Sequence, residues 1–441
     1  FEDRWNKQLS LKKKLVEIIE NNFLKFGFSS LETPSFEISK NIGSFLADDE
    51  ENSMSDVFTF NDGNEKITLR YDLSSPLSRF VAQNYREIPF PYKRYAIGNV
   101  WRNEKSGNAR YREFTQADVD IIGNTNKGQA DAEICNIISE TIKKTGLDDS
   151  QFKVNISNRK IVQGLINQLK INDKNQELKV IRAIDKLGRI GLKGVEDLLK
   201  KERVDVSGAV TKGANLTNQQ ASEILNFLKI NSLEDLKSIL KNSLSLEGIK
   251  EMEELLEIIS YGRYAKLIQP NFTIVRGLAY YDGFCVETNL NFKVKNSKGK
   301  EIDVGSIASG GRYDKLISRF KGADYPGTGM SIGVDRLLFV LNQISSIKTE
   351  NNAPVLICVL DKKYIKKYYE TLDYLREKGI SSELYLDSSK NLKKQLSFAD
   401  KKGCAAAIIF GESEIKENKF TLKNLKSSKE NDQKSVSKES L

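Results

Sequence analysis

Residues 101–120, WRNEKSGNARYREFTQADVD, place arginines beside carboxylates and aromatic rings within one short stretch. If two paired strands flank the loop KSGNA, Arg110 and Arg112 face the same side, as do Arg102 and Glu104, because side chains alternate along a strand. Arginines beside a flexible loop make a cationic surface suited to polyphosphates. A surface hairpin with cross-strand salt bridges is the alternative, and spacing alone does not separate the two.

The chain contains no histidine among its 441 residues. For this chain alone, that excludes Ser-His-Asp and Cys-His nucleophiles, histidine general bases and histidine metal ligands. Phosphoryl and nucleotidyl transfer remain compatible, because positioning, magnesium and arginine stabilise the charge in those reactions.

The length of 441 residues indicates two to four domains, and a hydrophobic content of 39% indicates a globular protein. No apolar run approaches the roughly 18 residues of a membrane span, and the first residues lack a signal-peptide pattern. The net charge of +9 is compatible with a polyanionic partner, although a solvated, lysine-rich surface is the more common cause of such an excess.

The four cysteines are far apart and form no CxxC pair, which argues against a zinc ribbon and against a disulfide framework. They are Cys135, Cys285, Cys358 and Cys404. We therefore expect reduced thiols and a cytoplasmic protein.

The pattern along the chain predicts mixed helices and strands. A helical period over 10–27 closes at Gly27, and 28–37 is expected to be a strand with Pro34 at an edge or turn. Short β-rich runs over 68–123, beginning with KITLRYDL, favour an antiparallel sheet, and a helix follows over 131–144.

The pattern of apolar and polar residues changes twice further along the chain. Residues 160–262 are mostly helical in pattern and interrupt strand-like sequence, so we expect the sheet begun before this insertion to be completed after it. After NNAP at 351–354, strands alternate with helices, which favours a small parallel α/β domain. The last residues are polar and are expected to be frayed.

Several segments resemble, in order, the motifs of one family. RNE…RYREFTQADVDIIG resembles the second signature motif of class II aminoacyl-tRNA synthetases, in the wording of the histidyl-tRNA synthetase family. LETPSFE and GTGMSIGVDRLLF resemble the first and third class motifs, and TLRYDLSSPLSRF resembles the amino-acid-binding strand. VRGLAYYDGFCVE and ASGGRYDKL resemble the two histidine-specific motifs. Agreement of several segments in order is more specific than any single match.

The resemblance implies an α/β fold with three parts. An α+β catalytic core is built on the class II antiparallel sheet flanked by helices, a helical insertion leans on the acceptor stem, and a C-terminal α/β domain binds the anticodon. The expected bounds are 1–160 and 263–347 for the core, 161–262 for the insertion, 352–426 for the anticodon-binding domain and 427–441 for a polar tail.

For ATP, the resemblance implies that Arg102 grips the α-phosphate, Glu104 reads the adenine amino group and Phe114 stacks on adenine. Arg110 and Arg336 are expected to hold the β- and γ-phosphates. On pattern alone, Arg336 could be a helix-surface cation.

Arg276 matches the family arginine that contacts the α-phosphate and the attacking carboxylate, so Arg276 and Arg102 are the expected catalytic residues. From the pattern alone, Arg276 could instead form a salt bridge on a strand. Mg²⁺ is expected to be held mainly by the ATP phosphates.

A histidine pocket needs an acceptor for one imidazole nitrogen and a donor for the other. Asp120 and Tyr281 match the family positions that provide them. The positions expected to hold the ammonium and carboxylate groups, or to line the same cavity, are Asp72, Ser74, Gln116 and Tyr313. Asp118 would face the same side as Asp120 and is expected to be a structural acid.

Three departures from the family pattern bear on the histidine pocket. Ala279 stands where the family usually has an acid, FCVE replaces TVFE, and RYDLS replaces the RPEGT form of many bacterial relatives. They leave the phosphate arginines intact, so fine substrate geometry is affected more than activity.

The resemblance implies a homodimeric ligase that activates histidine with ATP and transfers it to tRNA(His). The alternatives are a non-catalytic regulatory subunit of histidine biosynthesis, an RNA-binding or kinase-associated module that senses uncharged tRNA, and a synthetase for threonine or proline. The retained C-terminal domain and histidine-specific arginine motif speak against the first, and the retained Arg102, Glu104, Arg276 and Arg336 speak against the second. The threonine enzymes use a zinc site that this sequence cannot build.

Overall fold

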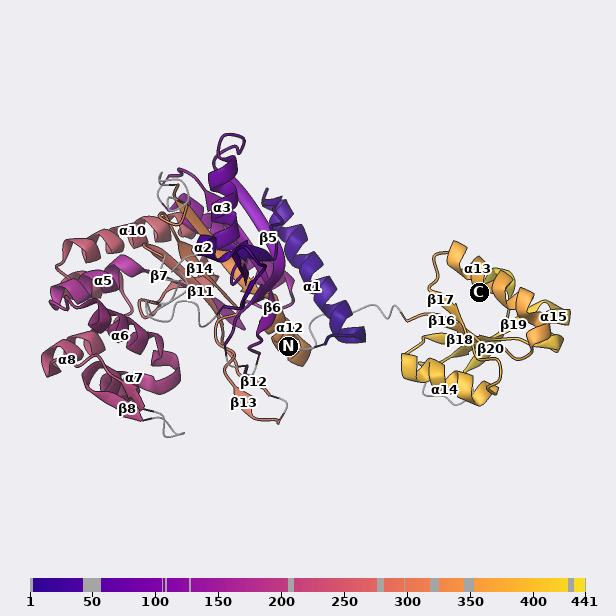
Figure 1. The fold of residues 1–441 in the computed structure, drawn as a ribbon. Coiled ribbons are helices and arrows are strands. Elements are labelled where there is room, and N and C mark those ends of the chain that lie inside the picture. Colours follow the sequence, from indigo (N-terminus) through magenta and orange to yellow (C-terminus); the bar gives the residue numbers. More distant parts are fainter. Residues whose placement is uncertain are drawn as a thin grey trace. The chain divides into compact units, whose positions relative to one another are not determined.

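The structure, a computed structural model, describes residues 3–42, 57–104, 106–107, 109–126, 128–204, 210–275, 281–296, 298–317, 325–344, 353–426 and 432–440. Contacts divide the chain into two compact units, Phe1–Lys348 and Thr349–Leu441 (Figure 1). The finer division of the first unit into a core and a helical insertion remains a prediction.

The first unit is built on an eight-stranded sheet in the order β1-β5-β6-β15-β14-β11-β7-β10. The two edge pairs, β1 with β5 and β10 with β7, are parallel, and the pairs between them are antiparallel. The strands are β1 (Ser29–Ser30), β5 (Tyr92–Trp101), β6 (Glu113–Ile122), β7 (Phe152–Asn158), β10 (Ile268–Pro270), β11 (Phe284–Leu290), β14 (Ala308–Arg312) and β15 (Gly327–Gly333). Strands from both sides of the helical segment therefore share one sheet, as predicted.

Three helices, α1 (Asn6–Lys25), α4 (Gln129–Lys144) and α12 (Val334–Ile344), pack against one face of this sheet. On α1, Leu15, Ile19 and Phe23 are fully buried, because residues four apart lie on the same side of a helix. Phe23 meets Tyr95 of β5 with ring centroids 5.9 Å apart. The expected N-terminal helix is thus confirmed, although it begins earlier, at Asn6.

The described residues between β7 and β10 form six α-helices: α5 (Arg159–Gln168), α6 (Lys174–Asp185), α7 (Leu187–Lys200), α8 (Asn218–Phe227), α9 (Leu233–Ile239) and α10 (Ser243–Ser260). In Figure 1, α6, α7 and α8 gather on the side of the unit away from α1. A Cβ at Gly164 would lie 2.5 Å from the Ser245 backbone nitrogen, so this glycine allows α5 and α10 to pack closely. A short hairpin, β8 (Glu202–Val204) with β9 (Val210–Lys212), was not expected.

The strand expected over 28–37 is wrong in part, because only β1 and β2 (Phe36–Ile38) are extended and the segment around Pro34 between them is not. β2 joins β4 (Lys66–Leu69) and β3 (Thr59–Asn61) in a separate three-stranded sheet, so KITL is not part of the large sheet. Two helices flank it, α2 (Ser39–Ile42) and α3 (Ser74–Asn84), and a further hairpin pairs β12 (Val294–Lys295) with β13 (Glu301–Ile302).

The second unit contains a five-stranded sheet in the order β17-β16-β18-β19-β20, in which β16 pairs in parallel with β17 and β18. Its main elements are β16 (Val355–Ile357), α13 (Ile365–Glu377), β17 (Ser382–Leu384), α14 (Leu392–Lys402), β18 (Ala406–Ile409), α15 (Glu412–Glu417), β19 (Lys419–Asn424) and β20 (Gln433–Ser437). The predicted alternation of strands and helices is confirmed.

The expectation of a frayed tail at 427–441 is wrong for β20, which pairs in an antiparallel manner with β19. Val436 supplies the physical reason, because this one apolar residue in a polar stretch packs against the hydrophobic core of the second unit.

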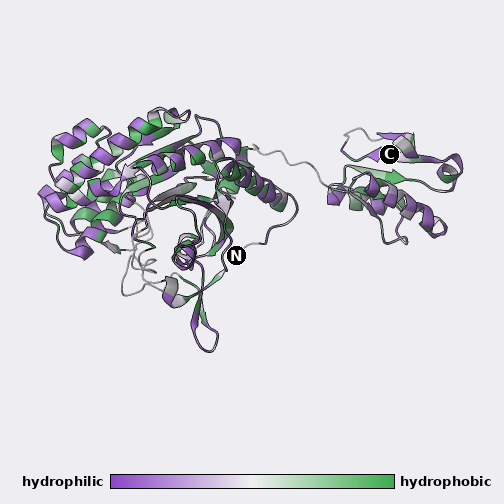
Figure 2. Ribbon diagram, turned by 90° about the horizontal axis from the view of Figure 1, so that it is seen from above, coloured by the Kyte–Doolittle hydropathy of each residue, from purple (hydrophilic) through white to green (hydrophobic). Residues whose placement is uncertain are grey.

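Hydrophobic and hydrophilic residues alternate along the helices of both units (Figure 2). This is the pattern of helices that bury one side against a sheet. Among the described residues, no helix is long and apolar enough to cross a membrane.

One buried carboxylate, Asp335 at the start of α12, joins three elements of the first unit. Its Oδ2 accepts the Thr115 backbone N–H at 2.6 Å, and its Oδ1 lies 3.0 Å from Arg4 and 3.2 Å from Lys12. It therefore connects α12 to β6 and to the N-terminal helix.

We predict that Asp335→Ala lowers the free energy of unfolding by about 3 kcal/mol, because it leaves two largely buried cations without their partner. Both tryptophans, Trp5 and Trp101, lie in the first unit, so tryptophan fluorescence in urea measures its unfolding. As a control, Glu17→Ala removes an exposed ion pair with Lys14 and should cost less than about 1 kcal/mol. Equal losses in both variants would contradict the prediction.

Candidate active site

The face of the large sheet opposite α1, α4 and α12 carries charged and polar side chains and is called the polar face below. In the register of β5, β6 and β15, Arg94 lies opposite Asp120, which lies opposite Gly329. In the next row of this face, Asp118 lies opposite Ser331. Because side chains alternate on each strand, the intervening residues point to the helices instead.

One cavity of about 120 Å³ lies beside the polar face. It brings together every described residue that was predicted to bind ATP, together with Gln116. These lining residues are Arg102, Glu104, Arg110, Phe114, Gln116 and Arg336.

Tyr71 contacts two of the residues that line this cavity and was not predicted from the sequence. The Arg102 guanidinium lies 4.3 Å from the Tyr71 ring centroid and 5.2 Å from that of Phe114, a distance at which cation–π attraction acts. The Tyr71 hydroxyl donates to Glu104 at 3.3 Å. Arg102 therefore faces Phe114 here, and stacking of Phe114 on adenine remains a prediction.

The expected strand geometry of 102–112 is wrong. β5 ends at Trp101 and β6 begins at Glu113, so alternation along a strand does not apply between them. Arg110 instead pairs with Glu104 at 3.4 Å, and Arg112 donates to the Asn103 side chain. The Arg110 side chain is 61% exposed, so its position is set by the connection between the strands and not by the sheet.

Arg336 is half-buried on the first turn of α12, where its Nη1 donates to the Ser306 carbonyl at 2.5 Å. This contact turns the side chain toward the cavity, which the helix-surface alternative did not anticipate. Arg276 and Ala279 lie outside the described residues.

Asp120, the predicted acceptor for the imidazole, lies on the polar face next to Tyr313, which was predicted to line the same pocket. Tyr313, directly after β14, donates its hydroxyl to Asp120 Oδ1, and Arg94 Nη2 lies 2.9 Å from Asp120 Oδ2. The Tyr281 and Tyr313 ring centroids are 6.5 Å apart. A Cβ at position 329 would lie 2.6 Å from Asp120 Cγ, so Gly329 makes room for this carboxylate.

Asp72 precedes α3, and Ser74 is the first residue of that helix. Asp72 Oδ1 accepts the Ser75 backbone N–H at 2.9 Å, and burial raises the pKa of the Asp72 carboxyl. The other oxygen, Oδ2, is buried without a hydrogen-bond partner among the described residues, and the same holds for Gln116 Oε1. Buried acceptors of this kind are expected to bind a polar ligand.

Asp118 faces the same side as Asp120, as expected from alternation. It accepts a hydrogen bond from the Ser331 hydroxyl, and burial raises the pKa of its carboxyl to about 7. Gln116 Nε2 donates to the same Ser331 hydroxyl at 2.5 Å. Neither Arg94 nor Ser331 was singled out in the sequence, because their roles depend on pairing between strands.

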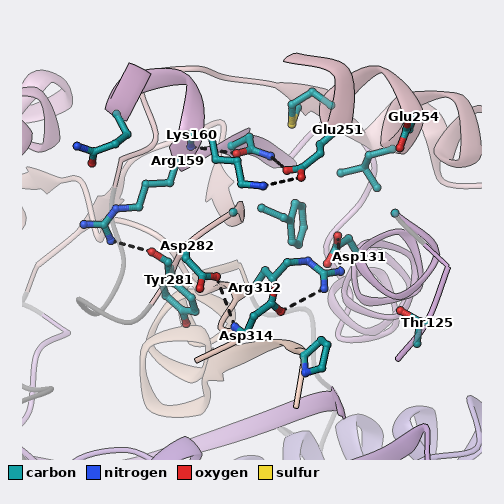
Figure 3. A pocket seen from close by; sticks show the side chains of 18 of the residues that line it. Thr125, Asp131, Arg159, Lys160, Glu251, Glu254, Tyr281, Asp282, Arg312 and Asp314 are labelled. Atoms are coloured by element: carbon teal, nitrogen blue, oxygen red, sulfur yellow. Dashed lines mark hydrogen bonds and ion pairs between the residues drawn. The ribbon is translucent and has the colours of Figure 1, made fainter. Parts of the chain in front are cut away.

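A larger cavity of about 710 Å³ lies beside Tyr281 (Figure 3). α5 and α10 form one side, and residues near the start of α4 and the end of β14 form the other. Arg159 of α5 donates to the Tyr281 carbonyl at 3.1 Å, so this cavity adjoins the candidate histidine pocket.

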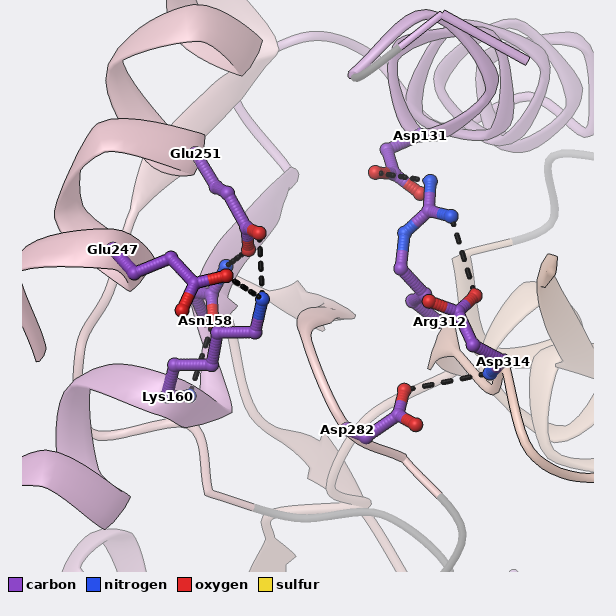
Figure 4. Close-up of polar contacts among 8 residues, drawn as sticks. All are labelled: Asp131, Asn158, Lys160, Glu247, Glu251, Asp282, Arg312 and Asp314. Atoms are coloured by element: carbon purple, nitrogen blue, oxygen red, sulfur yellow. Dashed lines mark hydrogen bonds and ion pairs between the residues drawn. The ribbon is translucent and has the colours of Figure 1, made fainter. Parts of the chain in front are cut away.

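Several of the charges that line the larger cavity are paired with one another (Figure 4). Lys160 lies 2.6 Å from Glu251, and Arg312 lies 2.8 Å from Asp131 and 3.4 Å from Asp314. The two ion-pair clusters connect α10 to α5 and β14 to α4.

The described residues contain no group of three or more Cys, Asp or Glu side chains that could hold a metal ion. All four cysteines are buried and free, as expected for reduced thiols.

A family model described as histidyl-tRNA synthetase matches residues 1–337, and one described as anticodon binding domain matches residues 354–441. A histidine--tRNA ligase of Pelagibacter ubique (strain HTCC1062) is 67% identical over 444 residues, covering 100% of this chain and 95% of that protein. A histidine--tRNA ligase of Ruegeria pomeroyi is 36% identical, with coverages of 96% and 88%. The crystal structure of histidyl-tRNA synthetase from Nostoc sp. PCC 7120 matches with a TM-score of 0.74 at 26% identity, covering 99% of this chain and 95% of that one.

The raised pKa of Asp118 predicts a pH-dependent stability. Between about pH 4 and pH 7 the folded state keeps a proton that the unfolded state has lost, so the contribution of Asp118 to stability falls as pH rises. Asp118→Asn removes this contribution. The unfolding free energy of the variant minus that of the unmodified chain, measured in urea titrations, should therefore increase as the pH rises from about 4 to 7.

Asp62→Asn is the control for this titration. Backbone N–H groups lower the pKa of this exposed carboxyl, so it is ionised in both states from about pH 5 upward and the difference should be flat from there to pH 7. A flat Asp118→Asn profile would show that Asp118 is ionised throughout.

Proposed function

Because this chain belongs to the histidyl-tRNA synthetase family, we propose that the residues gathered on the polar face are those that activate histidine with ATP. Membership makes the chain an aminoacyl-tRNA ligase, which converts histidine and ATP to histidyl-adenylate and transfers histidine to the 3′ end of tRNA(His). The regulatory-subunit alternative is not favoured, because the relative that is 67% identical over the whole chain is a ligase.

The observation that carries the residue assignment is the position of Gln116. It lines the cavity that holds the predicted ATP residues, and it lies on the same face of β6 as Asp120. A substrate whose carboxylate is near Gln116 and whose ring reaches Asp120 would place that carboxylate next to Arg102. This arrangement is the one that adenylation needs, since the carboxylate attacks the α-phosphate.

In the first step, a carboxylate oxygen of histidine forms a bond to the α-phosphorus while the bond to pyrophosphate breaks. Arg102 and, by resemblance, Arg276 offset the negative charge that builds on the α-phosphate oxygens. The attacking carboxylate is already ionised, so no protein base is required. This agrees with a chain that contains no histidine.

Mg²⁺ would be held mainly by the phosphates of ATP and by water, where it neutralises the charge of the departing pyrophosphate. The lining carboxylates support this arrangement, because Glu104 is paired with Arg110, and Asp335 is paired with Arg4 and Lys12. Cations of the chain thus already compensate the charges of both carboxylates.

In the second step, a hydroxyl of the terminal ribose of tRNA attacks the histidyl carbonyl and AMP leaves. The second unit matches an anticodon-binding family, and we propose that it reads unstacked anticodon bases, with lysines of 362–367 and 393–402 meeting phosphates. Homodimerisation remains a prediction from the resemblance, since Pro34 lies in the motif that builds the dimer interface in relatives, and a cytoplasmic location remains a prediction from the spacing of the cysteines.

We predict that exchange of labelled pyrophosphate into ATP occurs with histidine alone among the twenty amino acids. Arg102→Ala should lower kcat roughly 100- to 1,000-fold, because it removes a preorganised positive charge from the transition state. Arg276→Ala should have an effect of similar size.

The matched control is Arg263→Ala, which also removes an arginine that lies over a tyrosine ring, Tyr264, at 5.2 Å. It should leave the exchange rate unchanged. Absence of exchange with every amino acid, in folded protein with Mg²⁺ present, would contradict the assignment.

Gly329→Ala tests the histidine pocket separately from ATP. The added methyl group would overlap the Asp120 carboxylate and displace it. The KM for histidine should therefore rise roughly tenfold or more while the KM for ATP changes little, measured by the same exchange assay. Gly188→Ala, whose Cβ meets nothing within 4 Å, is the control. A rise in both KM values would indicate general distortion of the sheet.

A further inference from the structure

Arg94 is a fully buried arginine, with 0% of its surface exposed, on the polar face of β5. Burial of a guanidinium is costly unless nearby groups compensate its charge and bind its N–H groups. Its Nε and Nη1 have no hydrogen-bond partner among the described residues. The cost of burying the guanidinium must therefore be offset by the contacts of Nη2 and by the charge of the neighbouring carboxylates.

The Nη2 atom of Arg94 connects two separate parts of the chain. It lies 2.9 Å from Asp120 Oδ2, and it donates to the Leu73 carbonyl at 3.0 Å. Leu73 stands between Asp72 and Ser74, the residues expected to hold the amino-acid end of histidine, whereas Asp120 is expected to meet the imidazole. One nitrogen atom therefore joins the two ends of the candidate pocket.

Asp120 is held from both sides. Tyr313 donates to Oδ1 and Arg94 pairs with Oδ2, so neither rotation nor displacement of the carboxylate is possible without breaking one contact. A carboxylate has about four acceptor positions, so these two contacts leave room for an imidazole N–H.

We propose that Arg94 is a positioning residue for histidine: it keeps Asp120 in the ionised form that accepts the imidazole N–H, and it fixes the distance between Asp120 and the 72–74 segment. This inference rests on the proposed roles of Asp120 and Asp72 in histidine binding. It assigns Arg94 no contact with the substrate.

The charges around Asp120 support this role. Burial raises the pKa of both Asp118 and Asp120, and Arg94 opposes the shift in each. Of the two acids, Asp120 has the direct ion pair with Arg94 and the hydrogen bond from Tyr313, and both contacts favour its ionised form. Without Arg94, a protonated Asp120 would present a donor to an imidazole N–H, which is a mismatch.

Arg94→Met tests the proposal, because methionine fills part of the same space without charge. The KM for histidine in pyrophosphate exchange should rise roughly 10- to 100-fold, the size expected for loss of a charge-assisted hydrogen bond, while the KM for ATP changes less than about twofold. An unchanged KM for histidine in folded Arg94→Met protein would overturn the proposal, and so would an equal rise in both KM values.

Lys93→Met is a matched control on the adjacent position of the same strand. Lys93 points to the other face, where its ammonium donates to Glu133 at 2.9 Å and to the Phe26 carbonyl at 2.7 Å. Lys93→Met thus loses one carboxylate contact and one carbonyl contact, as Arg94→Met does, but away from the pocket. The melting temperature of Lys93→Met should fall while its KM for histidine stays unchanged. A rise in this KM equal to that in Arg94→Met would overturn the proposal.

A further variant keeps the test decisive if Arg94→Met does not fold. Arg94→Lys retains the positive charge but not the bond geometry of the guanidinium, so its KM for histidine should rise less than the roughly 10-fold expected for loss of the charge-assisted hydrogen bond, with the KM for ATP unchanged. A KM for histidine that equals that of the unmodified chain in both Arg94→Lys and Lys93→Met would overturn the proposal.

The unmodified chain separates this inference from the proposed function. If it shows no histidine-dependent exchange, the proposed function has failed. If it exchanges normally and Arg94→Met keeps the same KM for histidine, only the role of Arg94 has failed.

Discussion

The register of β6 between β5 and β15 is the constraint on which the candidate site depends. A shift of one residue would turn Ala117 and Val119 toward the pocket and bury Asp118 and Asp120 against the helices. The fully buried side chains of Leu15, Ile19 and Phe23 on α1 make such a shift unfavourable, because they need an apolar face to pack on. The hydrophobic core thus determines which side of the sheet carries the chemistry.

Charge balance is the second principle of the site. With no histidine available, arginines supply the positive charge in both parts of the pocket, at the phosphate end through Arg102 and Arg336 and at the imidazole end through Arg94. At the phosphate end, Arg102 lies over the rings of Tyr71 and Phe114, and Arg336 donates to the Ser306 carbonyl. Arg94 is instead fully buried against a carboxylate, as expected for a residue that holds another in position.

The fold could be predicted from the sequence where patterns are local. The periodicity of α1, the alternation of helices and strands after residue 353, and the completion of one sheet across the helical segment were all correct. The errors fall where tertiary contacts decide. KITL pairs in a separate sheet, and no strand assignment covers the described residues between Trp101 and Glu113. β20 forms in a polar segment whose Val436 packs against the hydrophobic core of the second unit. A single apolar residue in a polar stretch gives too weak a local signal to predict a strand.

The sequence by itself determined the kind of chemistry and the family motifs, because the absence of histidine and the order of the arginine-, acid- and glycine-containing segments can be read without coordinates. The gathering of the predicted ATP residues in one cavity, the bond between Tyr313 and Asp120, and the bridge from Arg94 to Leu73 were decided by the tertiary structure alone. The physical reason is that these contacts join residues on different strands and loops. Their distances depend on strand register and on the start of α3, neither of which is encoded in local spacing.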